Sequence, residues 1–241
     1  MSELIEVRSS VELPSHRENI TFETRDGLKL VGELATPVGR LARATLIMLH
    51  PLPTHGGFMD SHIYRKAANR LPALADLAVL RFNTRGTTSP RGTSEGEFGE
   101  GVTEVADVMA AIAYAQQRGL PDLWVVGWSF GTELALKYAV DQDVLGAILL
   151  SPPLHRTSDD ELLRWNENDK RLVALIPEFD DYLTPAQAEL RFALVPKIEL
   201  VAVDGAKHLW VGEAATKRVL DEIVRVVNPE RYPLAETFIL S

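Results

Sequence analysis

Short, nearly continuous apolar runs recur along the chain and alternate with segments whose apolar residues return every three to four positions. Apolar runs of this length are typical of strands that are buried on both faces, as in a parallel sheet. The runs cover residues 44–49, 77–82, 122–127, 144–150, 171–176 and 197–203. The segments with helical spacing cover residues 62–71, 103–117, 130–140, 185–194 and 213–227. This alternation predicts an α/β fold with a mostly parallel, doubly wound sheet.

The start of the chain has a different pattern. Residues 19–25 and 28–35 alternate or run apolar around Asp26-Gly27, which predicts an antiparallel hairpin ahead of the parallel strands. Residues 1–18 then form an N-terminal extension, and residues 228–241 form a C-terminal tail. Since no repeat or linker interrupts the pattern, we expect a single domain over residues 1–241. The tail packs either on the body of the protein or on a partner, so the sequence is compatible with a homo-oligomer.

Two of the helical segments allow a buried face to be predicted. In residues 103–117 the face is formed by Val105, Val108, Met109, Ile112 and Ala113. In residues 213–227 the apolar stripe is formed by Leu220, Ile223, Val224 and Val227. Asn228-Pro229 follows this second stripe and should end the helix.

Composition excludes several classes of protein. The 241 residues are 46% hydrophobic and 24% charged, with a net charge of −9 and no cysteine. This balance is that of an ordinary globular protein, and the missing cysteine excludes disulfides, cysteine-ligated metal sites and a thiol nucleophile. The chain has no block of lysines and arginines that could neutralise phosphates, so we do not expect nucleic acid as a partner. No run of membrane-span length and no signal-peptide core is present, so we expect a cytoplasmic protein with no membrane partner.

The strongest chemical signal is Gly127-Trp128-Ser129-Phe130-Gly131, which lies between a predicted strand and a predicted helix. This is the G-x-S-x-G nucleophile elbow in its required context. The sharp turn places Ser129 in a strained backbone region, and the glycines leave room for the neighbouring chain. The serine hydroxyl then projects above the sheet at a helix N-terminus. Ser129 is therefore the candidate nucleophile.

A serine needs a base, and in enzymes with such an elbow the acid and then the histidine follow the serine. His155 and His208 are the two histidines after Ser129. His208 lies directly after the last apolar run, whereas His155 comes too early to follow an acid. We therefore expect His208 to be the general base.

The acid should follow the run at 171–176. Asp180 is our choice for orienting the imidazole, with Asp181 as the direct competitor and Glu178 as a weaker one. Thr184-Pro185 already supplies a helix cap and a first-turn proline there. Asp204 ranks low because it lies at the end of the same run as His208.

Two backbone N–H groups are needed to stabilise an oxyanion. The residue after the nucleophile, Phe130, should supply one. The loop after the run at 44–49 should supply the other, and Pro51 and Pro53 cannot donate because proline has no N–H. Leu52 between them is therefore the second predicted donor.

Further polar residues lie before the elbow. His50 is expected to fix its loop by hydrogen bonding. His50, His55 and His62 do not have the spacing of a helical zinc pair, so we predict no metal and no cofactor. Arg81, Arg85 and Arg91 either line a pocket for an anionic substrate or tie their loop to nearby acids such as Glu95, Glu97 or Glu100. We favour ion pairing.

Taken together, these residues resemble the α/β-hydrolase superfamily. The resemblance is carried by HPLPTHGGFMDS, RFNTRGTTSPRGTSEGEFGEG, GWSFG, EFDDYLTP and AKHLWVG, in this order. It is closest in kind to the small lidless bacterial hydrolases that are similar to dienelactone hydrolases and serine aminopeptidases. His50-Pro51 replaces the usual His-Gly of the oxyanion loop. Dienelactone hydrolases use a cysteine nucleophile, which this chain lacks.

The resemblance implies a triad of Ser129, Asp180 and His208, with Leu52 and Phe130 as oxyanion donors. It also implies a serine hydrolase acting on small carboxylic esters through an acyl-enzyme. The alternatives are an acyltransferase or peptidase with the same triad, and a non-catalytic binding protein of this fold. Residues 151–170, where related enzymes insert a cap, can form a short helix but no lid domain.

Overall fold

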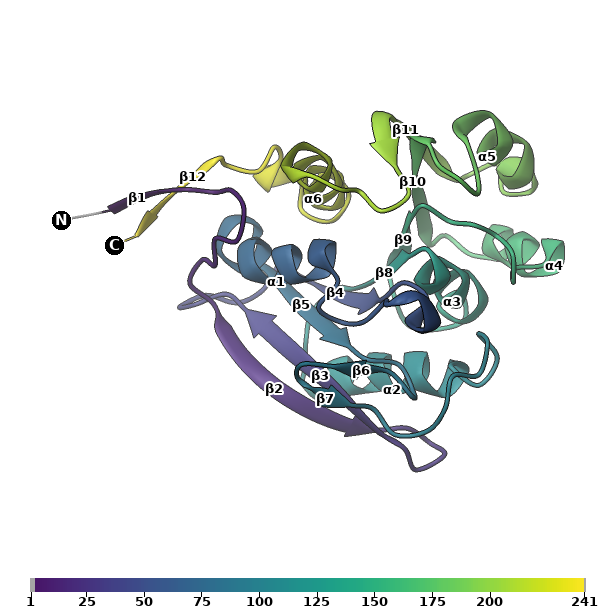
Figure 1. Cartoon of the computed structure of the whole chain (residues 1–241), viewed down its shortest axis with the longest axis horizontal. Helices are drawn as coiled ribbons and strands as arrows, with labels where there is room; N and C mark the ends of the chain where they lie inside the picture. The colour runs from purple at the N-terminus through teal and green to yellow at the C-terminus, as the bar shows by residue number, and fades with distance from the viewer. Residues whose placement is uncertain (1–2, 241) are drawn as a thin grey trace.

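An eight-stranded sheet runs through the centre of the computed structural model, which describes residues 3–240 (Figure 1). The strand order is β11-β10-β9-β8-β4-β5-β3-β2. The bounds are β2 (His16–Glu23), β3 (Lys29–Thr36), β4 (Ala44–Leu49), β5 (Leu77–Phe82), β8 (Leu123–Trp128), β9 (Gly146–Leu150), β10 (Arg171–Phe179) and β11 (Glu199–Lys207). Neighbouring strands from β11 to β5 are parallel, whereas β3 and β2 are antiparallel. The predicted mostly parallel sheet with an N-terminal hairpin is confirmed.

The hairpin turns at Asp26-Gly27, as the sequence predicts. The Thr24 N–H donates to the Leu28 carbonyl at 2.9 Å, and this hydrogen bond encloses the three residues of the turn, 25–27. Gly27 has a φ of 82°, a left-handed conformation that glycine adopts without steric cost.

Helices cover both faces of the sheet. The bounds are α1 (His62–Ala75), α2 (Val105–Gln117), α3 (Phe130–Tyr138), α4 (Asp159–Leu163), α5 (Pro185–Arg191) and α6 (Glu213–Val227). Shorter elements are η1 (Pro53–His55), η2 (Arg164–Glu167), η3 (Phe192–Leu194), η4 (Pro229–Arg231), β6 (Thr88–Ser89) and β7 (Gly92–Thr93). Figure 1 shows α1 and α6 on one side and α2 and α3 on the other. Between residues 3 and 240, no helix has both the length and the apolar surface that crossing a membrane would require.

Strand β4 shows why the parallel strands are apolar throughout. Leu46 and Met48 belong to the core beneath α1 and α6, and Ile47 and Leu49 belong to the core beneath α2 and α3. Alternate side chains of a strand point to opposite faces, and here both faces are covered. The strand therefore carries no polar alternation.

The two predicted helix faces have different outcomes. The stripe on α6 is confirmed, since its four residues are at most 9% exposed, and the helix ends before Pro229. On α2, Val108 and Ile112 of the predicted face are buried, and the other buried positions are Ala106, Asp107, Ala111 and Ala115. The other three predicted residues, Val105, Met109 and Ala113, are only half-buried. The small alanines allow α2 to approach the sheet closely.

The connection between β9 and β10 is short, as predicted. It forms α4 and η2, and Trp165 in η2 is fully buried with its indole N–H donated to the Leu136 carbonyl at 2.9 Å. This tryptophan fixes the connection against α3. No lid domain is inserted at this point of the described chain.

The two ends of the described chain meet in a small ribbon. β1 (Glu3–Glu6) pairs antiparallel with β12 (Thr237–Leu240), with Glu3 opposite Leu240. Figure 1 shows this ribbon projecting to the left of the body. Leu234 of the tail is buried in the core beneath α6, so the tail packs on its own chain. Residues 1, 2 and 241 of the extension and tail lie outside the described residues.

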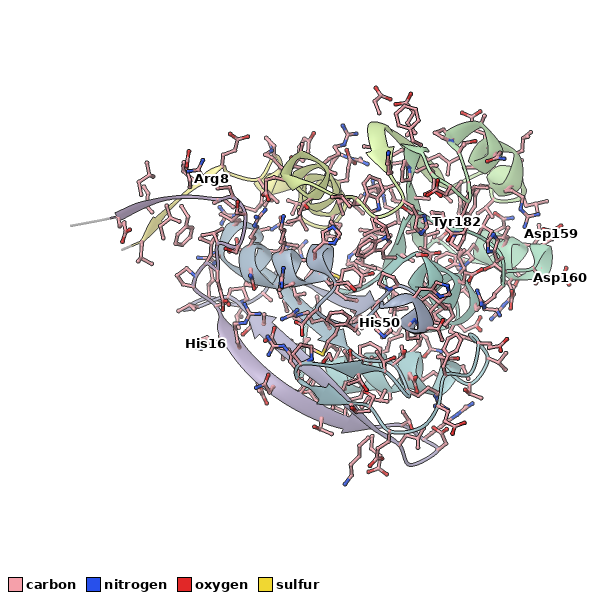
Figure 2. The ribbon with its side chains drawn as sticks, viewed as in Figure 1. Arg8, His16, His50, Asp159, Asp160 and Tyr182 are labelled. Atoms are coloured by element: carbon pink, nitrogen blue, oxygen red, sulfur yellow. The ribbon has the colours of Figure 1, made fainter. Side chains whose placement is uncertain are left out.

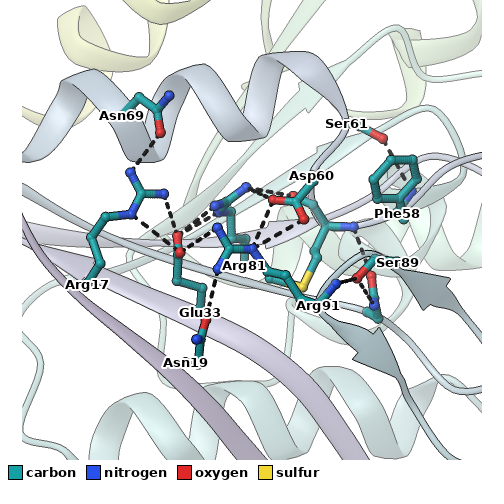
Figure 3. Close-up of polar contacts among 12 residues, drawn as sticks. Arg17, Asn19, Glu33, Phe58, Asp60, Ser61, Asn69, Arg81, Ser89 and Arg91 are labelled. Carbon is teal, nitrogen blue, oxygen red and sulfur yellow. Dashed lines mark hydrogen bonds and ion pairs between the residues drawn. The ribbon is translucent and has the colours of Figure 1, made fainter. Parts of the chain in front are cut away.

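A buried charge network ties the hairpin to the parallel strands (Figure 3). Glu33 on β3 is 2% exposed and lies at 2.7 Å from Arg17, 2.6 Å from Arg81 and 2.8 Å from Arg91. Arg81 is fully buried and also contacts Asp60 at 2.5 Å. Burial alone would raise the pKa of Glu33, but the Arg81 charge and the Arg17 hydrogen bond outweigh burial and hold it below its ordinary value.

We expect Glu33→Gln to lower the free energy of unfolding by about 3–5 kcal/mol, because it removes the buried negative charge that Arg17, Arg81 and Arg91 share. Glu12→Gln is the matched control, since Glu12 pairs with Arg17 at the surface and should cost less than about 1 kcal/mol. Urea unfolding of both variants measures the difference. The lowered pKa makes the Glu33 contribution complete above the ordinary glutamate pKa, and it is lost as the pH falls through the folded-state value. Equal losses in the two variants would contradict this prediction.

Candidate active site

The predicted site residues follow the carboxyl ends of four strands of the parallel sheet. Leu52 lies in the loop after β4, Ser129 directly follows β8, Asp180 directly follows β10, and His208 directly follows β11. Because parallel strands end at the same edge of the sheet, these loops gather there. The five predicted site residues, including Phe130, therefore lie at one edge of the sheet.

Ser129 has the strained backbone that an elbow requires, with φ 51° and ψ −117°. The two flanking glycines explain how the turn fits. A Cβ on Gly131 would lie 1.8 Å from the Leu49 carbonyl oxygen, and one on Gly127 would lie 2.3 Å from the Gly131 carbonyl oxygen. Any larger residue at either position would push β4, β8 and α3 apart. The Ser129 N–H donates to the Leu150 carbonyl at 2.9 Å, which anchors the turn to β9.

The side chains of Ser129, His208 and Asp180 form one hydrogen-bonded chain. The Ser129 Oγ lies 2.9 Å from His208 Nε2, and His208 Nδ1 lies 2.9 Å from Asp180 Oδ2. Asp180 and His208 are 7% and 6% exposed. The Asp180 Oδ1 also accepts the N–H groups of Tyr182 and Leu183 at 2.8 and 3.2 Å. These backbone donors fix the carboxylate, so it can hold His208 Nδ1 in the protonated tautomer.

The competing acids lie elsewhere. Asp181 is exposed, and Asp204 is also exposed on β11. Glu178 accepts the Gly205 N–H at 2.7 Å and thereby joins β10 to β11. Thr184 caps α5 in a capping box with Gln187, so neither aspartate is needed as the cap. Of these four acids, Asp180 is the one that contacts His208.

The backbone N–H groups of Leu52 and Phe130 are both free at this edge. Neither donates a hydrogen bond to another residue of the described range, and both residues line the same cleft as Ser129. The Leu52 carbonyl accepts the N–H groups of His55 and Gly57, which closes the loop into η1. A developing oxyanion beside Ser129 would therefore meet two unused donors.

His50 holds this loop in place, as the sequence predicts. Its Nδ1 donates to the Pro51 carbonyl at 2.7 Å, and its Nε2 accepts the Thr84 N–H at 3.0 Å. Burial lowers the pKa of His50 to about 4, although the hydrogen bond to Pro51 acts in the opposite direction. His50 is thus a neutral structural residue. Over residues 3–240, no group of three or more histidine and acidic side chains is placed to hold a metal ion.

A cleft of about 280 Å³ opens in front of Ser129. Leu52, Phe130, Pro153 and Leu209 form its apolar surface, while His155 and Tyr182 lie at its rim. The Tyr182 ring packs against the His208 ring with a centroid distance of 4.6 Å and against His155 at 5.4 Å. Figure 2 shows Tyr182 beside the end of β10. His155 therefore lines the cleft, whereas His208 is the histidine that is hydrogen-bonded to Ser129.

Arg81 on β5 and Arg85 and Arg91 in the segment after it all form ion pairs, and none of the three lines the cleft. The preference for ion pairing is confirmed, but the predicted partners were wrong. Arg85 pairs with Asp107 at 2.8 Å and with Asp26 at 3.0 Å, and the other two pair with Glu33 and Asp60. The partners are distant in sequence, which is why proximity along the chain pointed to the wrong acids.

Sequence reasoning missed two charged residues of the cleft, Glu133 and Arg156. Glu133 lies one helical turn after Ser129 on α3, a position that faces the same way as the nucleophile. Arg156 lies next to His155, in the connection after β9. The spacing from Ser129 would have been the signal for Glu133, whereas no local pattern distinguishes Arg156.

Comparison with known proteins identifies a family to which this chain is similar. The family model described as "alpha/beta hydrolase fold" matches residues 46–225. An uncharacterized protein of Rickettsia prowazekii is 33% identical over 128 residues, which are 48% of this chain and 51% of that protein. The match therefore spans about half the length of the curated relative.

Solved structures extend the likeness over most of the chain. An alpha-beta serine hydrolase homologue from Coxiella burnetii is 25% identical, with a TM-score of 0.72 and coverage of 87% of this chain and 97% of that chain. A Xanthomonas campestris protein described as an a/b serine hydrolase without lid is 24% identical, with a TM-score of 0.71 and coverage of 93% and 99%. The second likeness shows the fold alone.

Proposed function

This chain belongs to the α/β-hydrolase fold family, and from that premise we propose that it is a serine hydrolase that cleaves small carboxylic esters. The observation that carries the proposal is the hydrogen-bonded chain from Ser129 through His208 to Asp180 in front of an open cleft. A serine is a weak nucleophile unless a base takes its proton, and a base is most effective when a third group orients it. The three side chains have the arrangement that this chemistry needs.

In the proposed reaction, the Ser129 Oγ attacks the ester carbonyl carbon while His208 Nε2 takes the serine proton. Asp180 keeps the other imidazole nitrogen protonated and stabilises the imidazolium. The carbonyl oxygen becomes an oxyanion and accepts the N–H groups of Leu52 and Phe130. His208 then returns the proton to the leaving alcohol, and an acyl-enzyme remains on Ser129.

Water completes the cycle. His208 accepts a proton from the water that attacks the acyl carbonyl, and the second oxyanion meets the same two N–H groups. Collapse of this intermediate releases the carboxylic acid and returns the proton to Ser129. The connection of α4 and η2 leaves the cleft without a covering domain, so water can enter from solvent.

The size of the cleft supports small esters. Its volume of about 280 Å³ is near the lower limit of ligand sites, and the short β9–β10 connection supplies no long apolar tunnel. Long-chain lipids would leave most of their apolar surface in water. The same triad could transfer an acyl group or cleave an amide, and the fold could also bind without catalysis, so these alternatives are outcomes of the test.

A fluorophosphonate probe separates the catalytic from the non-catalytic outcome. We expect the folded protein to form a single adduct on Ser129, located by peptide mass spectrometry, because the probe reacts with serines that have an activated hydroxyl. Ser151 is the internal control, since it is buried and follows the neighbouring strand β9. An adduct elsewhere, or no adduct on folded protein, would contradict the proposal. Ester, thioester and amide substrates then rank the reaction types.

A further inference from the structure

The cleft contains one fixed positive and one fixed negative charge. Of its lining residues within the described chain, Arg156 is the only lysine or arginine and Glu133 is the only acid. Glu133 has a side chain that is 1% exposed, whereas the Arg156 side chain is 33% exposed. Of these two charges, the positive one is therefore the one that is open to a ligand.

Arg156 is held in place from two sides. Its backbone N–H donates to Glu133 Oε1. Its guanidinium carbon lies 5.7 Å from the centre of the Phe130 ring, and Phe130 directly follows the nucleophile. A cation over an aromatic face is stabilised without using its N–H donors. The residue is thus preorganised beside Ser129 while its hydrogen-bonding groups stay available.

The guanidinium donors of Arg156 differ from those of the buried arginines Arg81 and Arg85. Arg81 and Arg85 use theirs in short bonds to carboxylates. Arg156 Nη1 lies 3.5 Å from Glu133 Oε2, and no hydrogen bond from its guanidinium to a described residue is present. The Glu133 Oε2 is likewise buried without a hydrogen-bond partner. This pair is therefore loose, and an arginine with free donors at a cleft matches the planar geometry of a carboxylate.

Building on the proposed ester hydrolysis, we propose that Arg156 binds a second, ionised carboxylate of the substrate. The preferred substrates are then monoesters that carry a carboxylate a few atoms from the ester bond. Glu133 does not cancel this preference, because its buried carboxylate makes no hydrogen bond to the guanidinium, so the donors stay available to a substrate carboxylate. Its role is to position Arg156 and to balance its charge when no substrate is bound.

The test compares matched pairs of esters. On the acyl side, mono-4-nitrophenyl glutarate is compared with 4-nitrophenyl pentanoate, which has the same chain length but no charge. On the alcohol side, 4-acetoxybenzoate is compared with its methyl ester. We expect kcat/KM to favour the anionic member of one pair by about tenfold. The preference should weaken at high salt, since the charge is partly exposed.

Variants separate a specificity role from a structural one. Arg156→Gln should abolish the preference, measured as the ratio of kcat/KM for the two members of a pair, and Arg156→Lys should keep part of it. Arg118→Gln removes the same charge from the end of α2, outside the cleft, and should leave the preference unchanged.

Two kinds of failure are distinguishable. If neutral esters are cleaved but neither anionic ester is preferred, or if Arg156→Gln keeps the preference, the assignment of Arg156 is wrong and the hydrolase proposal stands. If no ester of either kind is cleaved by folded protein, the proposed function itself fails. A loss of neutral and anionic activity together in Arg156→Gln would indicate a structural role and would also overturn the assignment.

Discussion

Replacing Ser129 with alanine should lower the rate of ester hydrolysis by about 10⁴- to 10⁶-fold, because no other group can form the acyl-enzyme. The backbone of Ser129 has a positive φ that Gly127, Gly131 and β9 enforce, and alanine meets the same constraint as serine. The variant should therefore fold normally. Hydrolysis of 4-nitrophenyl acetate, with circular dichroism as the check on folding, measures the loss.

Ser158→Ala is a suitable control for this variant. Ser158 caps α4 and lies outside the cleft, so the change should cost about 1 kcal/mol of stability and leave turnover unaltered. A folded Ser129→Ala protein that hydrolyses the ester at the parent rate would show that Ser129 is not the nucleophile. The same result would remove the basis for His208 as its base.

The second large effect is expected for Asp180→Asn, which should reduce kcat by about 10³- to 10⁴-fold. The carbonyl oxygen of the introduced amide can still accept the N–H groups of Tyr182 and Leu183, and the amide NH₂ then faces His208 Nδ1. That nitrogen would have to accept instead of donate, so Nε2 would carry the proton. In this tautomer His208 cannot take the proton of Ser129.

Asp181→Asn is the matched control, since it makes the same chemical change one residue away on an exposed side chain. Its kcat should stay within about twofold of the parent value. Steady-state kinetics of both variants on one ester decide between the two aspartates. A larger loss of kcat in Asp181→Asn than in Asp180→Asn would show that Asp181 is the acid that orients His208.

The two aspartates also show where sequence reasoning ends. Both follow the same buried strand, and because they are adjacent, the spacing of residues along the chain does not distinguish them. What separates them is the turn after β10, in which the N–H groups of Tyr182 and Leu183 point at one carboxylate. Such a turn is set by three-dimensional packing, so the sequence could narrow the acid to a short segment and rank its members.

Elements with strong local signals could be predicted closely. β4 and β5 have the bounds that their apolar runs indicate, because strands covered on both faces must be apolar throughout. The elbow was equally clear, since its glycines, strand and helix lie in one continuous segment. The partners of Arg85 and the face of α2 depend on contacts between distant segments. The pairing of β1 with β12 joins two four-residue strands, too short for a periodic pattern.

That terminal ribbon has a topological consequence. Glu3 lies opposite Leu240, so the polypeptide runs through the fold almost as a closed ring. Joining these positions with a short linker and opening the chain in the exposed connection between β3 and β4 would produce a circular permutant. Every strand would keep its neighbours, and the strand ends that carry Ser129, Asp180 and His208 would be untouched. The fold of this protein should therefore depend on the cyclic order of its segments and not on the position at which the chain begins.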